Sequence, residues 1–84
     1  MGYYVYMLKS KGIKPVTYVG YTKDIKERLI LHNSGKGAKF TRGRKWQLIY
    51  KEKYNTKKEA ISREYYIKKN KNLRKKIKEN FKWK

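Results

Sequence analysis

Residues 17–32 read TYVGYTKDIKERLILH, and this stretch predicts a β-strand that leads directly into an α-helix. Its first residues are β-branched or aromatic, which suits a pleated and half-buried strand, and Gly20 among them lets another backbone or a ligand approach closely. Thr22 or Asp24 can cap the helix, and the Ser-Gly pair after Asn33 can end it. The stretch therefore predicts a strand over residues 16–21 and a helix from Asp24 to Asn33.

Three polar side chains of this stretch are expected to lie along one edge of the domain. Tyr18 and Gly20 are two residues apart on the strand and therefore share a face. Arg28 and His32 are four residues apart on the helix, which stacks them on one side, beside the apolar stripe that must face the sheet. A phenol, a guanidinium and an imidazole are thus predicted to gather there.

The composition limits the class of protein. The 84 residues provide for one small domain with a thin core, and 25 Lys and Arg against 6 Asp and Glu give a formal net charge of +19. This excess of cations favours a polyanionic partner, and nucleic acid is preferred over a membrane surface because tyrosines are interleaved with the basic residues. No apolar run suits a membrane span and no signal-type segment is recognised, so a cytoplasmic location is expected. The lack of cysteine excludes disulfides and Cys-based zinc sites.

The apolar patterns predict the other elements. A strand over residues 3–8 pairs as a hairpin with the strand over residues 16–21, and a matching register would let Tyr6 approach Tyr18. A capping box at Thr56 starts a second helix, which runs from Lys57 to about Lys69. A third strand over residues 46–54 is expected to have two faces: Trp46, Leu48 and Tyr50 on one, and Gln47, Ile49 and Lys51 on the other.

These elements predict a single α+β domain over residues 1–84, with a small, mostly antiparallel three-stranded sheet flanked by helices. Residues 70–84 are expected to form a basic C-terminal helix or tail, in which Leu73, Ile77 and Phe81 repeat every four residues among lysines. The preferred interpretation is that this seam closes the core while the lysines face water. The alternative is that the lysines lie along a strand of DNA.

Glu64 has an unusual position on the second predicted helix. Ala60, Glu64 and Ile67 lie at i, i+4 and i+7, so the carboxylate falls in the middle of an apolar stripe that Ile61 completes. An ionised carboxylate turned towards a core is costly unless a cation compensates it. A metal ion, or else Arg63 or a lysine, is therefore expected beside Glu64. The other acids are interpreted as helix caps (Asp24, Glu27, Glu59) or surface residues (Glu52, Glu79).

The order of these features resembles the GIY-YIG nuclease domain. The triplets Tyr4-Val5-Tyr6 and Tyr18-Val19-Gly20 match its two strand motifs, and helices carrying Arg28 and Glu64 follow. The resemblance covers about residues 3–69 and is closest to the small stand-alone branch of the superfamily and to the catalytic domain of the structure-specific nuclease subunit that cuts branched DNA. In that branch a histidine often follows the arginine by four residues, as His32 does. The first triplet departs from the pattern because it lacks the Gly and the Ile.

The resemblance implies hydrolysis of DNA phosphodiester bonds with one divalent ion, in repair or recombination intermediates. It implies that Glu64 holds Mg²⁺ or Mn²⁺, that Arg28 grips the scissile phosphate, and that Tyr6 orients or deprotonates the attacking water. Tyr18 and His32 would complete the hydrogen-bond shell, with His32 as an alternative proton carrier. Because a phenol is mostly protonated at neutral pH, nearby cations and the metal are expected to lower the pKa of Tyr6.

The glycine-rich loop over residues 35–45 is a second candidate surface for DNA. It lacks the spacing of a nucleotide-triphosphate loop. Its cations are expected to contact DNA phosphates, and they are Lys36, Lys39, Arg42, Arg44 and Lys45. The alternative is a solvated loop with no binding role.

Each site residue also has an ordinary structural interpretation. Tyr6 and Tyr18 are suited to any strand, Arg28 could pair with Asp24, and a lone histidine such as His32 is usually structural. The chain as a whole could be a non-catalytic nucleic-acid-binding module with the same basic face, or a basic protein of the membrane surface or the ribosome. A pure binding module has no use for a carboxylate beside a positive site, so a nuclease is preferred. A chain this small could need a partner protein or a homodimer to select its target.

Overall fold

The computed structural model describes residues 2–80, and its elements lie close to those that the sequence predicts. They are β1 (Tyr3–Ser10), β2 (Thr17–Thr22), α1 (Ile25–Asn33), β3 (Trp46–Tyr54), α2 (Lys57–Lys69) and α3 (Lys71–Asn80). The first strand continues two residues beyond its predicted end. The predicted place of Phe81 in the C-terminal seam lies outside the described residues.

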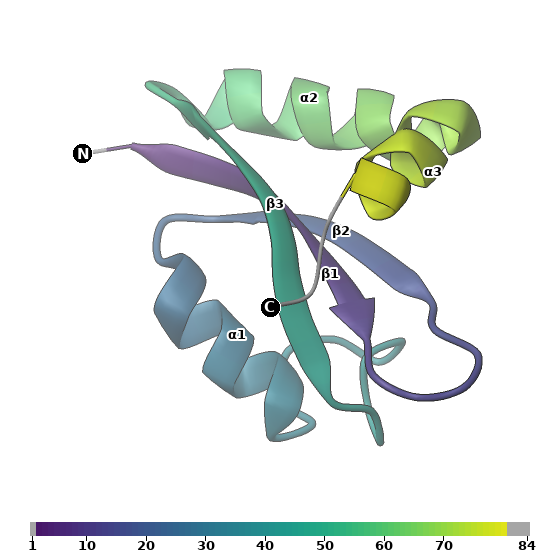
Figure 1. The fold of residues 1–84 in the computed structure, drawn as a ribbon. Helices are drawn as coiled ribbons and strands as arrows, with labels where there is room; N and C mark the ends of the chain where they lie inside the picture. Colours follow the sequence, from purple (N-terminus) through teal and green to yellow (C-terminus); the bar gives the residue numbers. More distant parts are fainter. Residues whose placement is uncertain (1, 81–84) are drawn as a thin grey trace.

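The sheet has the order β2-β1-β3 with both pairings antiparallel, so β2 and β3 are its edges. Figure 1 shows α1 on one side of the sheet and α2 with α3 on the other. The predicted α+β class, a small antiparallel sheet flanked by helices, is confirmed. Within residues 2–80 no helix has both the length and the apolar character that a membrane crossing needs.

Each face of the sheet has its own core. Tyr6, Leu8 and Trp46 are buried on the α1 side, where Ile25 and Leu29 of α1 pack against them. The other face buries a cluster of Val5, Met7, Val19, Ala60 and Ile67, with Leu73 and Ile77 of α3 packed onto it. Fully burying one such aliphatic side chain stabilises the fold by about 1.5–3 kcal/mol. The preferred interpretation of the C-terminal seam is therefore borne out for Leu73 and Ile77.

A β-bulge in β3 changes which residues face α2. Neighbouring residues of β1 face Tyr50 and Leu48, so Ile49 is the extra residue on β3. Beyond it Tyr50 packs with the α2-side core, whereas Leu48 and Trp46 pack on the α1 side. The predicted common face of Trp46, Leu48 and Tyr50 is wrong for Tyr50. The bulge also turns Glu52 towards α2.

The helix starts follow the predicted caps. Oδ1 of Asp24 accepts the backbone N–H of Glu27 at 3.0 Å, and Thr56 accepts that of Glu59 at 3.2 Å. On α2, Ala60 and Ile67 are fully buried, but Ile61 is 41% exposed. Ile61 therefore does not complete the apolar stripe as predicted. The side of α2 that packs on the sheet passes through Ala60 and Ile67, and Ile61 lies outside it. The carboxylate of Glu64 is left at the border of the core.

Candidate active site

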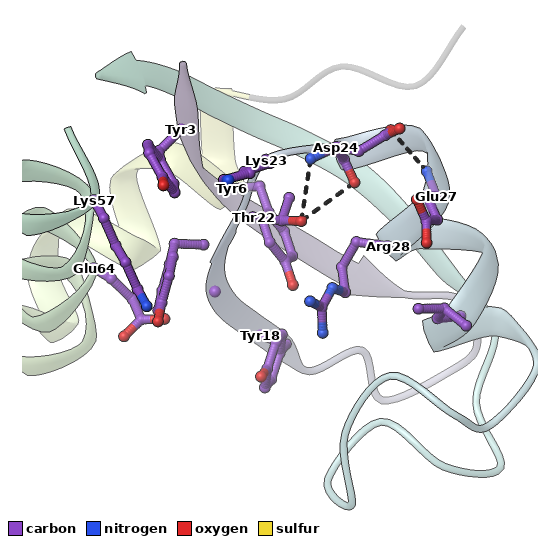
Figure 2. Close-up of a pocket in the computed structure, with 13 residues that line it drawn as sticks. Tyr3, Tyr6, Tyr18, Thr22, Lys23, Asp24, Glu27, Arg28, Lys57 and Glu64 are labelled. Carbon is purple, nitrogen blue, oxygen red and sulfur yellow. Dashed lines mark hydrogen bonds between the residues drawn. The ribbon is translucent and has the colours of Figure 1, made fainter. Parts of the chain in front are cut away.

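A cleft of about 570 Å³ lies where the two layers of helices meet at the outer edge of β2. Tyr6 on β1, Tyr18 and Gly20 on β2, Arg28 on α1 and Glu64 on α2 all line it. Figure 2 shows Glu64 entering from one side and Arg28 from the other, with Tyr6 and Tyr18 between them. Helices from opposite faces of the sheet can reach one cleft only around the edge strand. The four predicted side chains of this group are thus brought together.

Gly20 makes this convergence possible. It faces Tyr6 across the β1–β2 ladder, and a Cβ at Gly20 would lie 2.6 Å from the Tyr6 hydroxyl oxygen and 3.1 Å from the ring of Tyr18. Any side chain at Gly20 would therefore push at least one phenol out of place. The sequence predicts the approach of another backbone or a ligand at this glycine, whereas the groups found against it are the side chains of these two tyrosines.

His32 is buried and bonds directly to Tyr6. The Tyr6 hydroxyl lies 2.8 Å from Nε2 of His32, and the two residues are only 3% and 1% exposed. His32 therefore lies behind Tyr6, as seen from the cleft, and does not line the cleft itself. His32 therefore contacts the site through its hydrogen bond to Tyr6.

Thr41 bonds to the other ring nitrogen of His32. The Thr41 hydroxyl oxygen lies 2.9 Å from Nδ1 of His32 and 2.9 Å from the backbone oxygen of Ala38, and it has one proton to donate. When that proton goes to Ala38, the hydroxyl oxygen accepts from Nδ1 of His32, and Nε2 of the neutral ring is then the acceptor for the Tyr6 hydroxyl.

The pKa shifts of these groups reflect burial first. Burial raises the pKa of Tyr6 well above the ordinary value of a phenol, and the nearby Tyr18 and Glu64 add to the rise while Arg28 opposes it. The prediction that surrounding cations lower the pKa of Tyr6 is therefore wrong for the protein itself, because the loss of solvent outweighs Arg28. Burial and the charge of Arg28 both lower the pKa of His32, so it is neutral at pH 7.

Arg28 and Glu64 supply opposite charges to the same cleft. Burial raises the pKa of Tyr18, and Glu64 raises it further while Arg28 lowers it, so both charges act on this phenol as they do on Tyr6. Arg28 makes no ion pair within residues 2–80, so the alternative pairing with Asp24 is absent there. Its guanidinium points into the cleft (Figure 2).

Glu64 has the surroundings of a single-carboxylate metal ligand. Its side chain is 17% exposed, and its one ion pair among the described residues is a long contact of 3.7 Å to Lys68. No group of three or more His, Cys, Asp or Glu side chains that could hold a metal exists in residues 2–80. Mg²⁺ commonly keeps several waters and binds through one or two carboxylates together with substrate phosphates. The residues present fit such an ion and do not fit a metal held by the protein alone.

The five cations predicted in the loop over residues 35–45 are all exposed, and none of them lines the cleft. The loop is nevertheless anchored, because Thr41 is completely buried and its backbone oxygen accepts a bond of 2.9 Å from the indole of Trp46. Phe40 of this loop is 56% exposed and stacks on Tyr18, with ring centroids 6.2 Å apart. The contact of the five cations with DNA stays a prediction.

Sequence reasoning missed several residues around the site. Lys57 lines the cleft next to Glu64, and nothing in the sequence distinguishes it from the other lysines. Thr41 and Gly37 hold His32, since a Cβ at Gly37 would lie 2.3 Å from Nδ1 of His32. The signal for both is the short loop between the histidine and the third strand, and neither predicted interpretation of this loop, a DNA-binding surface or a solvated loop, includes a contact with His32.

Glu52 is not a surface residue as predicted. Its carboxylate accepts two bonds from Arg63 of α2, at 2.8 and 3.0 Å, and also the hydroxyl protons of Tyr50 and Tyr54. These bonds hold the pKa of Glu52 at about 2, although burial opposes them. They fasten β3 to α2 one residue before Glu64. Arg63 is therefore engaged with Glu52 and does not neutralise Glu64.

Comparison with known proteins agrees with this arrangement, since the GIY-YIG catalytic domain matches residues 2–78. This chain belongs to the GIY-YIG family. The predicted resemblance is thereby confirmed, and a nuclease-type domain with it. This GIY-YIG chain is 49% identical over 67 residues to the UPF0213 protein SSP2268 of Staphylococcus saprophyticus, with 79% of each chain covered. It is 44% identical over 68 residues to the UPF0213 protein YazA of Bacillus subtilis, covering 80% of this chain and 67% of that one.

A solved structure also resembles this GIY-YIG domain. It is the solution NMR structure of the UPF0213 protein BH0048 of Bacillus halodurans, which is 40% identical and superposes with a TM-score of 0.54. The match covers 90% of this chain and 80% of that one. The chain is therefore a small GIY-YIG domain of the UPF0213 type.

Proposed function

We propose that this chain is a metal-dependent endonuclease that hydrolyses phosphodiester bonds of DNA, in repair or recombination intermediates. The observation that carries the proposal is the cleft at the edge of β2, where the buried Tyr6–His32 pair meets a guanidinium from one helix and a carboxylate from another. Binding DNA requires only positive charge, which a chain of net charge +19 has in excess. Binding does not require a buried histidine bonded to the hydroxyl of Tyr6, whereas a hydrolytic reaction can use such a pair to accept a proton.

The direction of the hydrogen bonds defines a path for the proton of the attacking water. The water oxygen bonds to phosphorus while its proton passes to the hydroxyl oxygen of Tyr6, and Tyr6 gives its own proton to Nε2 of His32. The bond from phosphorus to the leaving oxygen breaks, and that oxygen takes a proton from solvent. Because the pKa of Tyr6 is raised, Tyr6 acts as a relay and not as a standing phenolate. His32, neutral at pH 7, is the acceptor.

Arg28 and Tyr18 hold the phosphate for this attack. The guanidinium of Arg28 has two parallel N–H groups that match two phosphate oxygens, and it has no carboxylate partner within residues 2–80 to compete for them. Its charge also opposes the negative charge that builds up on the phosphate in the transition state. Tyr18, beside Tyr6 at a centroid distance of 6.4 Å, adds a further hydroxyl donor.

Glu64 would hold one Mg²⁺ or Mn²⁺ ion at the other side of the cleft through its carboxylate oxygens. When bound, such an ion supplies charge stabilisation to the phosphate and the leaving oxygen. Glu64 is suited to the task because its long contact to Lys68 leaves the carboxylate open to the cleft. A partner protein or a homodimer for substrate selection stays a prediction.

The proposal is tested by incubating the purified chain with duplex, flap, fork and four-way DNA substrates, each with Mg²⁺, with Mn²⁺ or with a chelator. We expect cleavage of at least one substrate with either ion and none with the chelator. Binding of all four substrates without cleavage under any condition would contradict the proposal and would favour a non-catalytic nucleic-acid-binding module.

A further inference from the structure

A second groove, of about 640 Å³, runs from the site along the first half of β2. One wall is formed by residues 15–19 at the free edge of the sheet, and the other by the end of α2 and by α3. Figure 1 shows α3 beside the C-terminal end of α2. Tyr18 lines both this groove and the cleft that holds Glu64, so the two hollows meet at one catalytic side chain.

The wall on α3 is a row of lysines. Lys71, Lys75 and Lys78 lie at i, i+4 and i+7 and therefore project from one side of the helix, and all three line the groove. The neighbouring side of α3 carries Leu73 and Ile77, which pack onto the core. The packing of Leu73 and Ile77 on the core therefore sets the side of α3 from which the three lysines project.

No acid balances these lysines. The groove has five cationic side chains and no carboxylate among its lining residues. Lys68 has a long ion pair with Glu64, and Glu79, the acid of α3, shares a neighbouring hollow with Lys75 without an ion pair between them. Within residues 2–80, Lys71, Lys75 and Lys78 make no ion pair. Arg74 is used differently, because its Nη1 donates to the backbone oxygens of Ile67 and Lys68 and so joins α3 to the end of α2. The three lysines are therefore the cations that remain for a ligand.

We propose that the groove between β2 and α3 carries the phosphate backbone of the DNA strand on one side of the scissile bond. This rests on the proposed function and adds to it the direction in which the strand leaves the cleft. Along a helix that rises about 1.5 Å per residue, Lys71 to Lys78 spans about 10 Å. One strand of a duplex carries a phosphate for about every 3.4 Å of helix axis, and neighbouring phosphates lie farther apart than that along the backbone, so the row can contact about two successive phosphates. A single small anion would contact only one of these lysines, whereas a strand with several phosphates can contact all of them.

The loop over residues 35–45 also reaches Tyr18, through the ring of Phe40. Because the groove meets the site at the same Tyr18, we expect the groove and the loop to contact the strand on different sides of the scissile bond. We expect the lysines of the groove to contribute more to DNA affinity than other exposed lysines of the chain. An experiment can measure this difference.

The test compares two triple variants with equal loss of charge. K71Q/K75Q/K78Q removes the groove lysines, and K51Q/K58Q/K76Q removes three exposed lysines that do not line the groove. Affinity for a fluorescent DNA is measured in chelator over a series of salt concentrations. We expect the groove variant to bind about tenfold or more weaker and to lose about 2–3 from the slope of log K against log salt, and the control to change by less than about threefold.

A second measurement gives the position of the strand. Because the chain has no cysteine, Lys75→Cys and Arg42→Cys each create a single attachment point for an iron chelate that cleaves nearby DNA. We expect the two probes to cut on opposite sides of the scissile bond. Equal effects of the two triple variants, or cuts by the Lys75→Cys probe on both sides alike, would overturn the groove assignment. The binding series is independent of the nuclease proposal, because it is measured in chelator without cleavage. The probe positions refer to the scissile bond and are therefore read on a substrate that the unmodified chain cleaves, so a chain that does not cleave overturns the nuclease proposal while the binding series still tests the groove.

Discussion

The hydroxyl oxygen of Tyr6 lies 2.8 Å from Nε2 of His32, and this hydrogen bond between two buried side chains joins the central strand to α1. If it is the proton path, Tyr6→Phe should lower the cleavage rate by about 10²–10⁴-fold, the range of general acid–base catalysis. The affinity for DNA should not change, because the hydroxyl adds no charge. Single-turnover cleavage and binding in chelator measure the two effects separately.

Tyr4→Phe is the matched control, since Tyr4 lies two residues earlier on β1 and does not line the cleft. It should cleave at the normal rate. Equal rates for Tyr6→Phe and the unmodified chain would show that the contact is only structural.

His32 should make the stability of the protein depend on pH. Its pKa is lowered in the folded state, by burial first and by Arg28 second, so the unfolded chain binds a proton before the folded chain does. The free energy of unfolding should be complete above about pH 6.5, the unfolded value, and should fall as the pH drops through the lowered pKa. Urea unfolding at pH 7 and pH 5 measures this.

His32 is the one histidine of the chain, and Glu52, with a pKa of about 2, titrates far below this range. A His32→Asn variant should therefore lose the change between pH 7 and pH 5. The cleavage rate should fall over the same acid range, because a protonated Nε2 cannot accept the proton of Tyr6. A change in stability that is the same in the variant would assign it to another group.

Gly20→Ala should disable the site without unfolding the domain. The added Cβ would lie 2.6 Å from the Tyr6 hydroxyl oxygen, so the phenol must move by several tenths of an ångström. A misplacement of about 1 Å can cost about 10²-fold in rate, so we expect a loss of up to that size. Gly2→Ala is the control away from the cleft, since its Cβ would lie 2.7 Å from the flexible end of Lys53 and 3.1 Å from the backbone oxygen of Tyr54. Cleavage rates and thermal unfolding of both variants decide the point, and normal cleavage by Gly20→Ala would mean that Tyr6 does not need its observed position.

The bonds of Glu52 should matter for stability. Glu52→Gln removes the charge that Arg63 pairs with and replaces one of the two acceptor oxygens by an amide NH2 donor, so it should lower the free energy of unfolding by about 2–4 kcal/mol. Because the pKa of Glu52 is held at about 2, the same stability should also be lost in the unmodified chain as the pH falls from about 4.5 towards 2. A double-mutant cycle with Arg63→Met measures the coupling, and a coupling near zero would contradict the account.

The sequence predicted the strands and helices, and strand alternation and helix spacing placed Tyr18 beside Arg28. The approach of Tyr6 depended on the strand register, and Glu64 joined this group only through the resemblance to the GIY-YIG domain. The sequence did not predict the bulge at Ile49, which depends on how β3 aligns with β1 and which turns Glu52 towards α2. It also could not predict that burial dominates the pKa of Tyr6. Solvent exclusion is a property of the assembled layers and not of any local pattern.

The central claim is that Glu64 belongs to a hydrolytic site, and the most direct test compares Glu64→Gln with Glu79→Gln. The two substitutions remove the same charge, but only Glu64 lines the cleft. Single-turnover cleavage of DNA with Mn²⁺ is measured together with DNA binding in chelator. We predict that Glu64→Gln binds DNA normally and does not cut it, while Glu79→Gln does both. Cleavage by Glu64→Gln at the rate of the unmodified chain would contradict the account.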